Sequence, residues 1–182
     1  MLDLGIPLQL GIGRYRIAAP LDRGSATYIG KRHRRTSLDT ASELVCDTTA
    51  SLGPFIVAPQ LIENMLIRGT SKVVGSVGVA MENTNPLTFL GWSKLDTVRI
   101  SGFDLQLHTG NVFIMALKDV ILEEGLKGWD VKPANDAGDN GYFTTIYTDN
   151  LTIRECSDYG FDIAPDLKSP NLSLKNFNVE NC

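Results

Sequence analysis

The segment Asn150-Leu151-Thr152-Ile153 is one of a series of short segments that recur along this chain. Most of them begin with Asn or Asp and continue with apolar and polar residues in alternation. The other members are residues 64–67, 96–100, 119–122 and 171–174. Aligning Met65, Val98, Val120, Leu151 and Leu172 gives steps of 33, 22, 31 and 21 residues. Steps of this size and irregularity predict successive coils of a solenoid, with loops inserted into some coils.

The alternation predicts the secondary structure of each segment. Val98 and Ile100 flank Arg99, and the same pattern recurs at residues 151–153. A period of two with one apolar face is typical of half-buried strands. Little helix is expected, with residues 59–65 as the best short candidate. The rival all-β architecture is an antiparallel sandwich, but Asn140-Gly141 is the only strong hairpin signal in the chain.

A second kind of segment begins with glycine and follows the first in most repeats. This segment occurs at residues 78–81, 110–114, 128–131 and 160–163. Glycine permits the sharp bend that would take the chain from one face of a coil to the next. The register of the last coil stays open, because matching Val179 to Ile153 would give a step of 26 residues instead of 21.

The bulk composition limits the classes of partner. The chain has 182 residues, 43% of them hydrophobic, and a formal net charge of -4. This mild negative charge disfavours nucleic acid and anionic membranes as ligands. No apolar run approaches the roughly 20 residues of a membrane-spanning helix, and no export signal is visible at the start. Cys46, Cys156 and Cys182 lack metal-ligand spacing and are predicted to be reduced, core-facing thiols.

Several segments resemble a known superfamily. Residues 13–21, which read GRYRIAAPL, resemble the opening of pectin-lyase-like β-helices, and residues 150–156 and 178–182 resemble their later coils. The Thr-rich lead-in at residues 141–148 is most similar to phage tailspike and capsule-depolymerase proteins. This resemblance implies a right-handed parallel β-helix in a homotrimeric virion tail protein, which binds and often cleaves a bacterial surface polysaccharide.

We accordingly expect residues 1–60 to form an N-terminal strand region with the first coil. Residues 61–182 would form further coils that break off in mid-coil. Two alternatives remain open. One is a secreted, monomeric bacterial polysaccharide lyase or glycoside hydrolase, in which a lyase would use calcium and a base such as Arg99, Arg154 or Lys175. The other is a purely structural solenoid segment that spaces other modules.

The candidate catalytic residues are Asp130 and Asp162. If residues 128–131 lie directly under residues 160–163, the two carboxylates stack on neighbouring strands. Glycosidases use such a carboxylate pair, and repulsion between two close carboxylates raises one pKa toward that of a general acid. Trp129 is expected to point into the core. His108 is read as a turn residue without a catalytic partner.

The candidate carbohydrate-binding residues lie in predicted loops. Trp92 and Tyr142 offer flat aromatic faces for stacking on sugar rings. Asp136 and Asp139 lie in an insert between two coils, where ligand contacts tend to concentrate. No metal site is predicted from these residues, apart from the calcium that a lyase would require.

Overall fold

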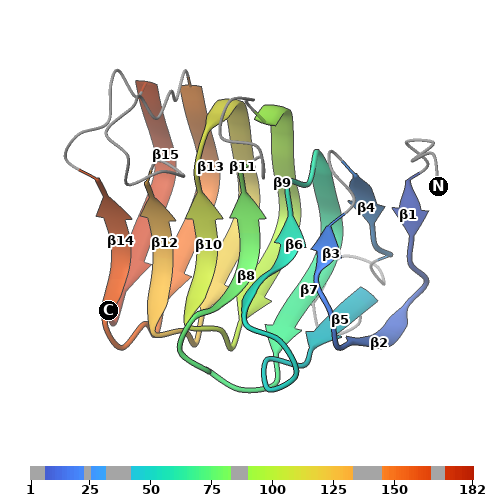
Figure 1. Cartoon of the computed structure of the whole chain (residues 1–182). Helices are drawn as coiled ribbons and strands as arrows, with labels where there is room; N and C mark the ends of the chain where they lie inside the picture. The colour runs from blue at the N-terminus through green and yellow to red at the C-terminus, as the bar shows by residue number, and fades with distance from the viewer. Residues whose placement is uncertain (1–6, 23–25, 32–41, 83–89, 133–144, 165–170) are drawn as a thin grey trace.

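The computed structural model describes residues 7–22, 26–31, 42–82, 90–132, 145–164 and 171–182, and all regular structure in these ranges is β-strand. The strands gather into two sheets in which every pair is parallel, as Figure 1 shows. The all-β prediction is confirmed. The helix candidate at residues 59–65 is wrong, because Leu61–Gly69 forms a strand whose alternating side chains reach the core.

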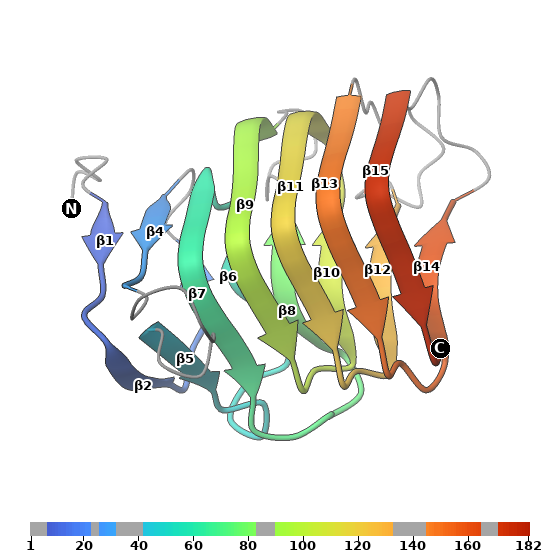
Figure 2. The same cartoon turned by 180° about the vertical axis from the view of Figure 1, so that it is seen from behind.

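Sheet A is the longer-stranded sheet and faces the viewer in Figure 2. Its strands are β1 (Leu8–Gln9), β2 (Gly13–Ile17), β4 (Thr27–Ile29), β5 (Ser42–Cys46), β7 (Leu61–Gly69), β9 (Leu90–Ser101), β11 (Val112–Glu123), β13 (Thr145–Arg154) and β15 (Asn171–Glu180). Sheet B contains β3 (Leu21–Asp22), β6 (Gly53–Val57), β8 (Ser76–Met81), β10 (Leu105–Thr109), β12 (Lys127–Val131) and β14 (Tyr159–Ile163).

From β7 onward the chain alternates strictly between the two sheets. Each strand pairs with the strand one turn further along, in the order β7-β9-β11-β13-β15 for sheet A and β8-β10-β12-β14 for sheet B. β1 and β15 therefore lie at opposite ends of the stack (Figure 1). Parallel pairing between successive turns is consistent with a β-solenoid-like fold. Strands before residue 61 join the same two sheets, with β4 and β5 pairing with the two halves of β7.

The pairing register tests the predicted repeat directly. Met65 pairs with Val98, Val98 with Val120, and Val120 with Leu151, as the sequence predicts. The last step is wrong, because Leu151 pairs with Phe177 and not with Leu172. The alternative step of 26 residues is the correct one, since β15 runs alongside the whole of β13 and its second half occupies the equivalent position.

The glycine-led segments are confirmed at three of four places. Residues 78–81, 128–131 and 160–163 fall in β8, β12 and β14. Residues 110–114 do not belong to this series, because they run into the start of β11 in sheet A. The equivalent strand is β10, where Leu107 pairs with Val79 on one side and Trp129 on the other. Gln106 stands there in place of the expected glycine.

A row of left-handed backbone conformations explains why Asn or Asp leads three of the five strand segments, at Asn64, Asp119 and Asn150. One residue in the middle of each long strand of sheet A has a positive φ between 50° and 65°. These residues are Asn64, Thr97, Asp119, Asn150 and Asn176. Asn and Asp tolerate this conformation better than other residues with a Cβ atom. The recurring bend therefore selects the recurring residue type.

The core is a column of apolar side chains between the sheets. Val98, Val120 and Leu151, which pair in one row, are each at most 1% exposed. Trp129 is fully buried, as predicted, and its ring centroid lies 4.7 Å from that of Phe161. Burying side chains of this size contributes roughly 1.5–3 kcal/mol each. Inward residues thus hold the stack together, while outward residues are available for function.

Candidate functional site

Sheet B carries a compact group of charged residues on its outer face, near the carboxyl ends of its strands. His108 pairs in register with Asp130, and Asp130 pairs with Asp162. The predicted stacking of the two aspartates on neighbouring strands is confirmed. Glu82 and Lys132 follow β8 and β12 and join the same group. We call Glu82, His108, Asp130, Lys132 and Asp162 the sheet B cluster.

The contacts within the sheet B cluster form a continuous chain of opposite charges. Nδ1 of His108 lies 2.6 Å from Oδ1 of Asp130, and its Nε2 lies 3.2 Å from Oε2 of Glu82. Nζ of Lys132 lies 3.5 Å from Oδ2 of Asp130 and 2.8 Å from Oδ2 of Asp162. Each cation is thus held between two carboxylates. The prediction that His108 is a turn residue is wrong, because it lies within β10.

Electrostatics keep both cations of the cluster protonated at neutral pH. Burial alone would lower the pKa of His108, but its hydrogen bonds to Asp130 and Glu82 outweigh this effect and raise the pKa to about 9. The hydrogen bond to Asp162 raises the pKa of Lys132 above its usual value. Imidazolium and ammonium groups therefore face the carboxylates, and the paired charges stabilise one another.

Exposure divides the sheet B cluster into an inner and an outer part. The side chains of Asp130 and His108 are 9% and 18% exposed, whereas those of Lys132 and Asp162 are 39% and 44% exposed. A ligand from solvent would meet Asp162 and Lys132 first. Since Lys132 lies between the two aspartates, its ammonium offsets the carboxylate repulsion that we expected to create a general acid.

Trp92 lies in a different place, on the outer face of sheet A. The sequence predicts it in a loop, but it belongs to β9, and it is 69% exposed. It borders an open groove of about 490 Å³, which we call the Trp92 groove. The other residues that line this groove are Thr27, Gln60, Leu61, Ser93, Lys94 and Ala116. An aromatic face beside amide, hydroxyl and ammonium groups is suited to stacking and hydrogen bonding with a sugar.

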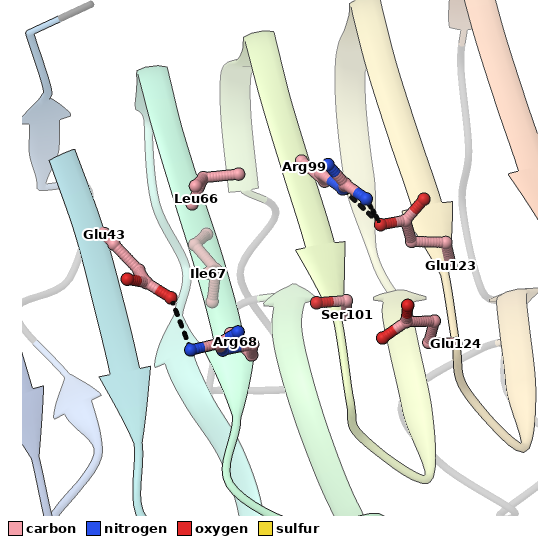
Figure 3. A pocket seen from close by; sticks show the side chains of 8 residues that line it. All are labelled: Glu43, Leu66, Ile67, Arg68, Arg99, Ser101, Glu123 and Glu124. Atoms are coloured by element: carbon pink, nitrogen blue, oxygen red, sulfur yellow. Dashed lines mark hydrogen bonds and ion pairs between the residues drawn. The ribbon is translucent and has the colours of Figure 1, made fainter. Parts of the chain in front are cut away.

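A second pocket on sheet A, of about 160 Å³, is lined mainly by charged residues (Figure 3). On one side of this pocket, Glu43 forms an ion pair with Arg68 at 3.0 Å. On the other side, Glu123 is only 2% exposed and is contacted by Arg99 and, at 2.6 Å, by Arg154. The two arginines that the lyase alternative offers as bases are thus both engaged with Glu123. The remaining candidate base, Lys175, lies 3.3 Å from Asp149.

Three of the predicted carbohydrate-binding residues fall outside the part of the chain that the structure describes. These are Tyr142, Asp136 and Asp139. Within the described residues, no group of three or more His, Cys, Asp or Glu side chains is arranged to hold a metal ion. The described ranges also contain no helix long and apolar enough to cross a bilayer.

Sequence reasoning identified Asp130, Asp162 and Trp92 but missed Glu82, His108 and Lys132. Glu82 lies 26 residues before His108 in the chain, so only strand pairing reveals their contact. The available signal was the position of Lys132 two residues after Asp130, because an extended chain directs the side chains of residues i and i+2 to the same side. Comparison of the chain with protein-family profiles, curated proteins and solved structures finds no match.

Proposed function

We propose that this chain forms coils of a right-handed parallel β-helix of the tailspike-like kind and binds a bacterial surface polysaccharide through the outer face of sheet A. The same proposal assigns it to a homotrimer in a virion tail. The observation that carries the binding proposal is the Trp92 groove, in which an exposed indole lies beside Gln60 and Lys94. An exposed aromatic ring with polar side chains beside it offers a flat apolar surface on which a sugar ring can stack.

A polymeric ligand is favoured over a small one by the arrangement of this face. Lys94 pairs with Ala116, and Ala116 pairs with Tyr147, so these residues form one row across three strands. Tyr147 is 49% exposed. Since neighbouring strands are about 4.8 Å apart, the row spans roughly 10 Å and reaches one strand, about 5 Å, beyond the Trp92 groove. An extended glycan lying across the strands would contact Trp92 first and Tyr147 next.

The binding proposal is tested with a panel of bacterial capsule and lipopolysaccharide glycans. We expect the intact chain to bind at least one of them, and Trp92→Ala to weaken that binding about tenfold through loss of ring stacking. Phe113→Ala is the matched control, because Phe113 is 48% exposed and is not among the described residues that line the groove. Absence of binding to every glycan, or equal effects of both substitutions, would refute the proposal. Sedimentation velocity tests the homotrimer separately, and a monomer would contradict that part.

A second candidate function is hydrolysis of the bound glycan at the sheet B cluster, which the alignment of Asp130 with Asp162 favours. In this role the exposed Asp162 carboxylate would accept a proton from the water that attacks the anomeric carbon, and the glycosidic bond would break as its oxygen takes a proton from solvent. Lys132 would orient the Asp162 carboxylate. Asp130 and His108, which are the more buried members of the cluster, would hold Asp162 and Lys132 in position.

Hydrolysis is tested by reducing-end release from the same glycans. We expect Asp162→Asn to lower the rate at least 100-fold. Asp149→Asn is the control, because Asp149 has a similarly exposed side chain, 48%, and also pairs with a lysine. Calcium-dependent release of unsaturated, ultraviolet-absorbing products would favour the lyase alternative instead. Absence of both activities would leave a binding or spacer role.

A further inference from the structure

Two of the three cysteines occupy equivalent positions on successive turns at the edge of the stack. Arg154 and Glu180 are partners in the β13–β15 register, and Cys156 and Cys182 each follow two residues later. The intervening residues, Glu155 and Asn181, have nearly equal φ values of 57° and 53°. The two turns therefore share one backbone conformation and lie one strand spacing apart, which is about 4.8 Å.

Hydrogen bonds support this equivalence. The Cys156 thiol donates to the carbonyl of Arg154 at 3.7 Å, and the Cys182 thiol donates to the carbonyl of Glu180 at 3.3 Å. The backbone N–H of Glu155 donates to the Glu180 carbonyl at 3.1 Å and links the two turns. Both side chains consequently leave the backbone in the same direction. The prediction that all three thiols face the core is wrong for Cys182, which is exposed.

We propose that Cys156 and Cys182 are a redox-active pair that closes into a disulfide between successive turns. The strand spacing falls within the range of roughly 4.4–6.8 Å between Cα atoms that a disulfide requires. Gly160 lies beside the pair, and a Cβ atom there would approach Sγ of Cys182 to 3.2 Å. The glycine thus leaves the space that the sulfur needs. This inference is independent of the proposed glycan binding.

The oxidant is a small-molecule disulfide such as oxidised glutathione. The Cys182 thiolate attacks one sulfur of that molecule and releases its other half as a thiolate. Cys156 then loses its proton and attacks the Cys182 sulfur, which forms the protein disulfide and releases the second half. Two protein thiols are oxidised, one small disulfide is reduced to two thiols, and the protons pass to solvent.

Accessibility sets the order of these two steps. Cys182 is exposed and reacts first, whereas Cys156 is 3% exposed. Burial, together with the neighbouring Cys182 thiol, raises the pKa of Cys156 to about 12, which disfavours its thiolate and protects it from direct attack by small molecules. Cys46 is the internal control, because it is fully buried in β5 and lies outside the pair.

The test treats the reduced intact chain with oxidised glutathione at pH 8 and maps the cysteine peptides by mass spectrometry. We expect a Cys156–Cys182 cross-link, an unmodified Cys46 and a rise in Tm of about 5–10 °C. Cys156→Ser should stop the reaction at a glutathione adduct on Cys182, and Cys182→Ser should leave Cys156 unmodified. A persistent adduct on Cys182 in the unsubstituted chain, or a disulfide joining two chains through Cys182, would overturn the proposal.

Discussion

The outer faces of the two sheets organise charge in different ways. On sheet A, Glu123 is enclosed by the guanidinium groups of Arg99 and Arg154, which come from the strands on either side. On sheet B, the corresponding central group is His108, enclosed by Glu82 and Asp130. In each group one contact joins residues that pair in register, Glu123 with Arg154 and His108 with Asp130, whereas Arg99 and Glu82 reach the central residue from positions offset by two residues. The difference is that two guanidinium groups hold a carboxylate on one face, whereas two carboxylates hold a histidine whose pKa is raised to about 9 on the other.

Backbone packing also differs between individual glycine positions of the two sheets. Sheet B brings Gly128 so close to Gly160 that an added Cβ atom would lie 2.3 Å from the Gly160 carbonyl oxygen. In sheet A, Gly91 of β9 has no described atom within 4 Å of the equivalent position. Glycine is therefore a steric requirement at position 128 and not at position 91.

The largest expected effect tests the steric contrast between Gly128 and Gly91. Gly128→Ala should lower the free energy of unfolding by about 3 kcal/mol, because backbone and the Ile153 side chain must move to admit the methyl group. Gly91→Ala should change it by less than about 0.5 kcal/mol. Urea denaturation of both variants measures the difference. Comparable losses in the two variants would show that the close approach in sheet B does not control its stability.

A smaller effect distinguishes the group around His108 from the group around Glu123 by the pH dependence of their contributions to stability. The pKa of His108 is raised to about 9, so its stabilising contribution is complete below the ordinary pKa near 6.5 and is lost as the pH rises through 9. We expect the stability difference between the unsubstituted chain and His108→Asn to shrink by about 2 kcal/mol between pH 6 and pH 10. Chemical denaturation at a series of pH values measures it.

Glu123→Gln supplies the control for this pH dependence. Arginine stays protonated throughout the range, so the loss caused by this substitution should be constant from pH 6 to pH 10. If the Glu123→Gln loss instead followed the same pH profile as His108→Asn, the assignment of the titration to the sheet B cluster would be wrong.

The smallest effect concerns the row of left-handed residues in sheet A. Thr97 has a φ of 56° but carries a β-branched side chain, which disfavours this conformation. Thr97→Asn should therefore raise the free energy of unfolding by about 1 kcal/mol. The reciprocal change, Asn150→Thr, should lower it by about the same amount, and it also removes the 2.8 Å hydrogen bond to Asp119. Thermal and urea unfolding of the pair measure both shifts, and effects of equal sign would contradict the explanation.

The sequence alone determined those features that repeat locally. Alternation at residues 96–100 and 150–153 predicted strands with one buried face, and Asn150 marked a bend that few other residue types tolerate. Because Asp130 and Asp162 occupy the same place in two similar segments, their stacking was also predictable. Each of these inferences needs only the order of residues within one or two coils.

The tertiary structure decided what depends on pairing between distant segments. Residues 171–174 and 176–179 resemble each other, and only hydrogen bonding along the whole of β13 selects Phe177 as the partner of Leu151. The place of His108 between Glu82 and Asp130, and the burial of Glu123, likewise follow from the register of strands more than 20 residues apart. Local patterns specify which face of a strand is buried, but the free energy of pairing whole strands sets which outward side chains meet.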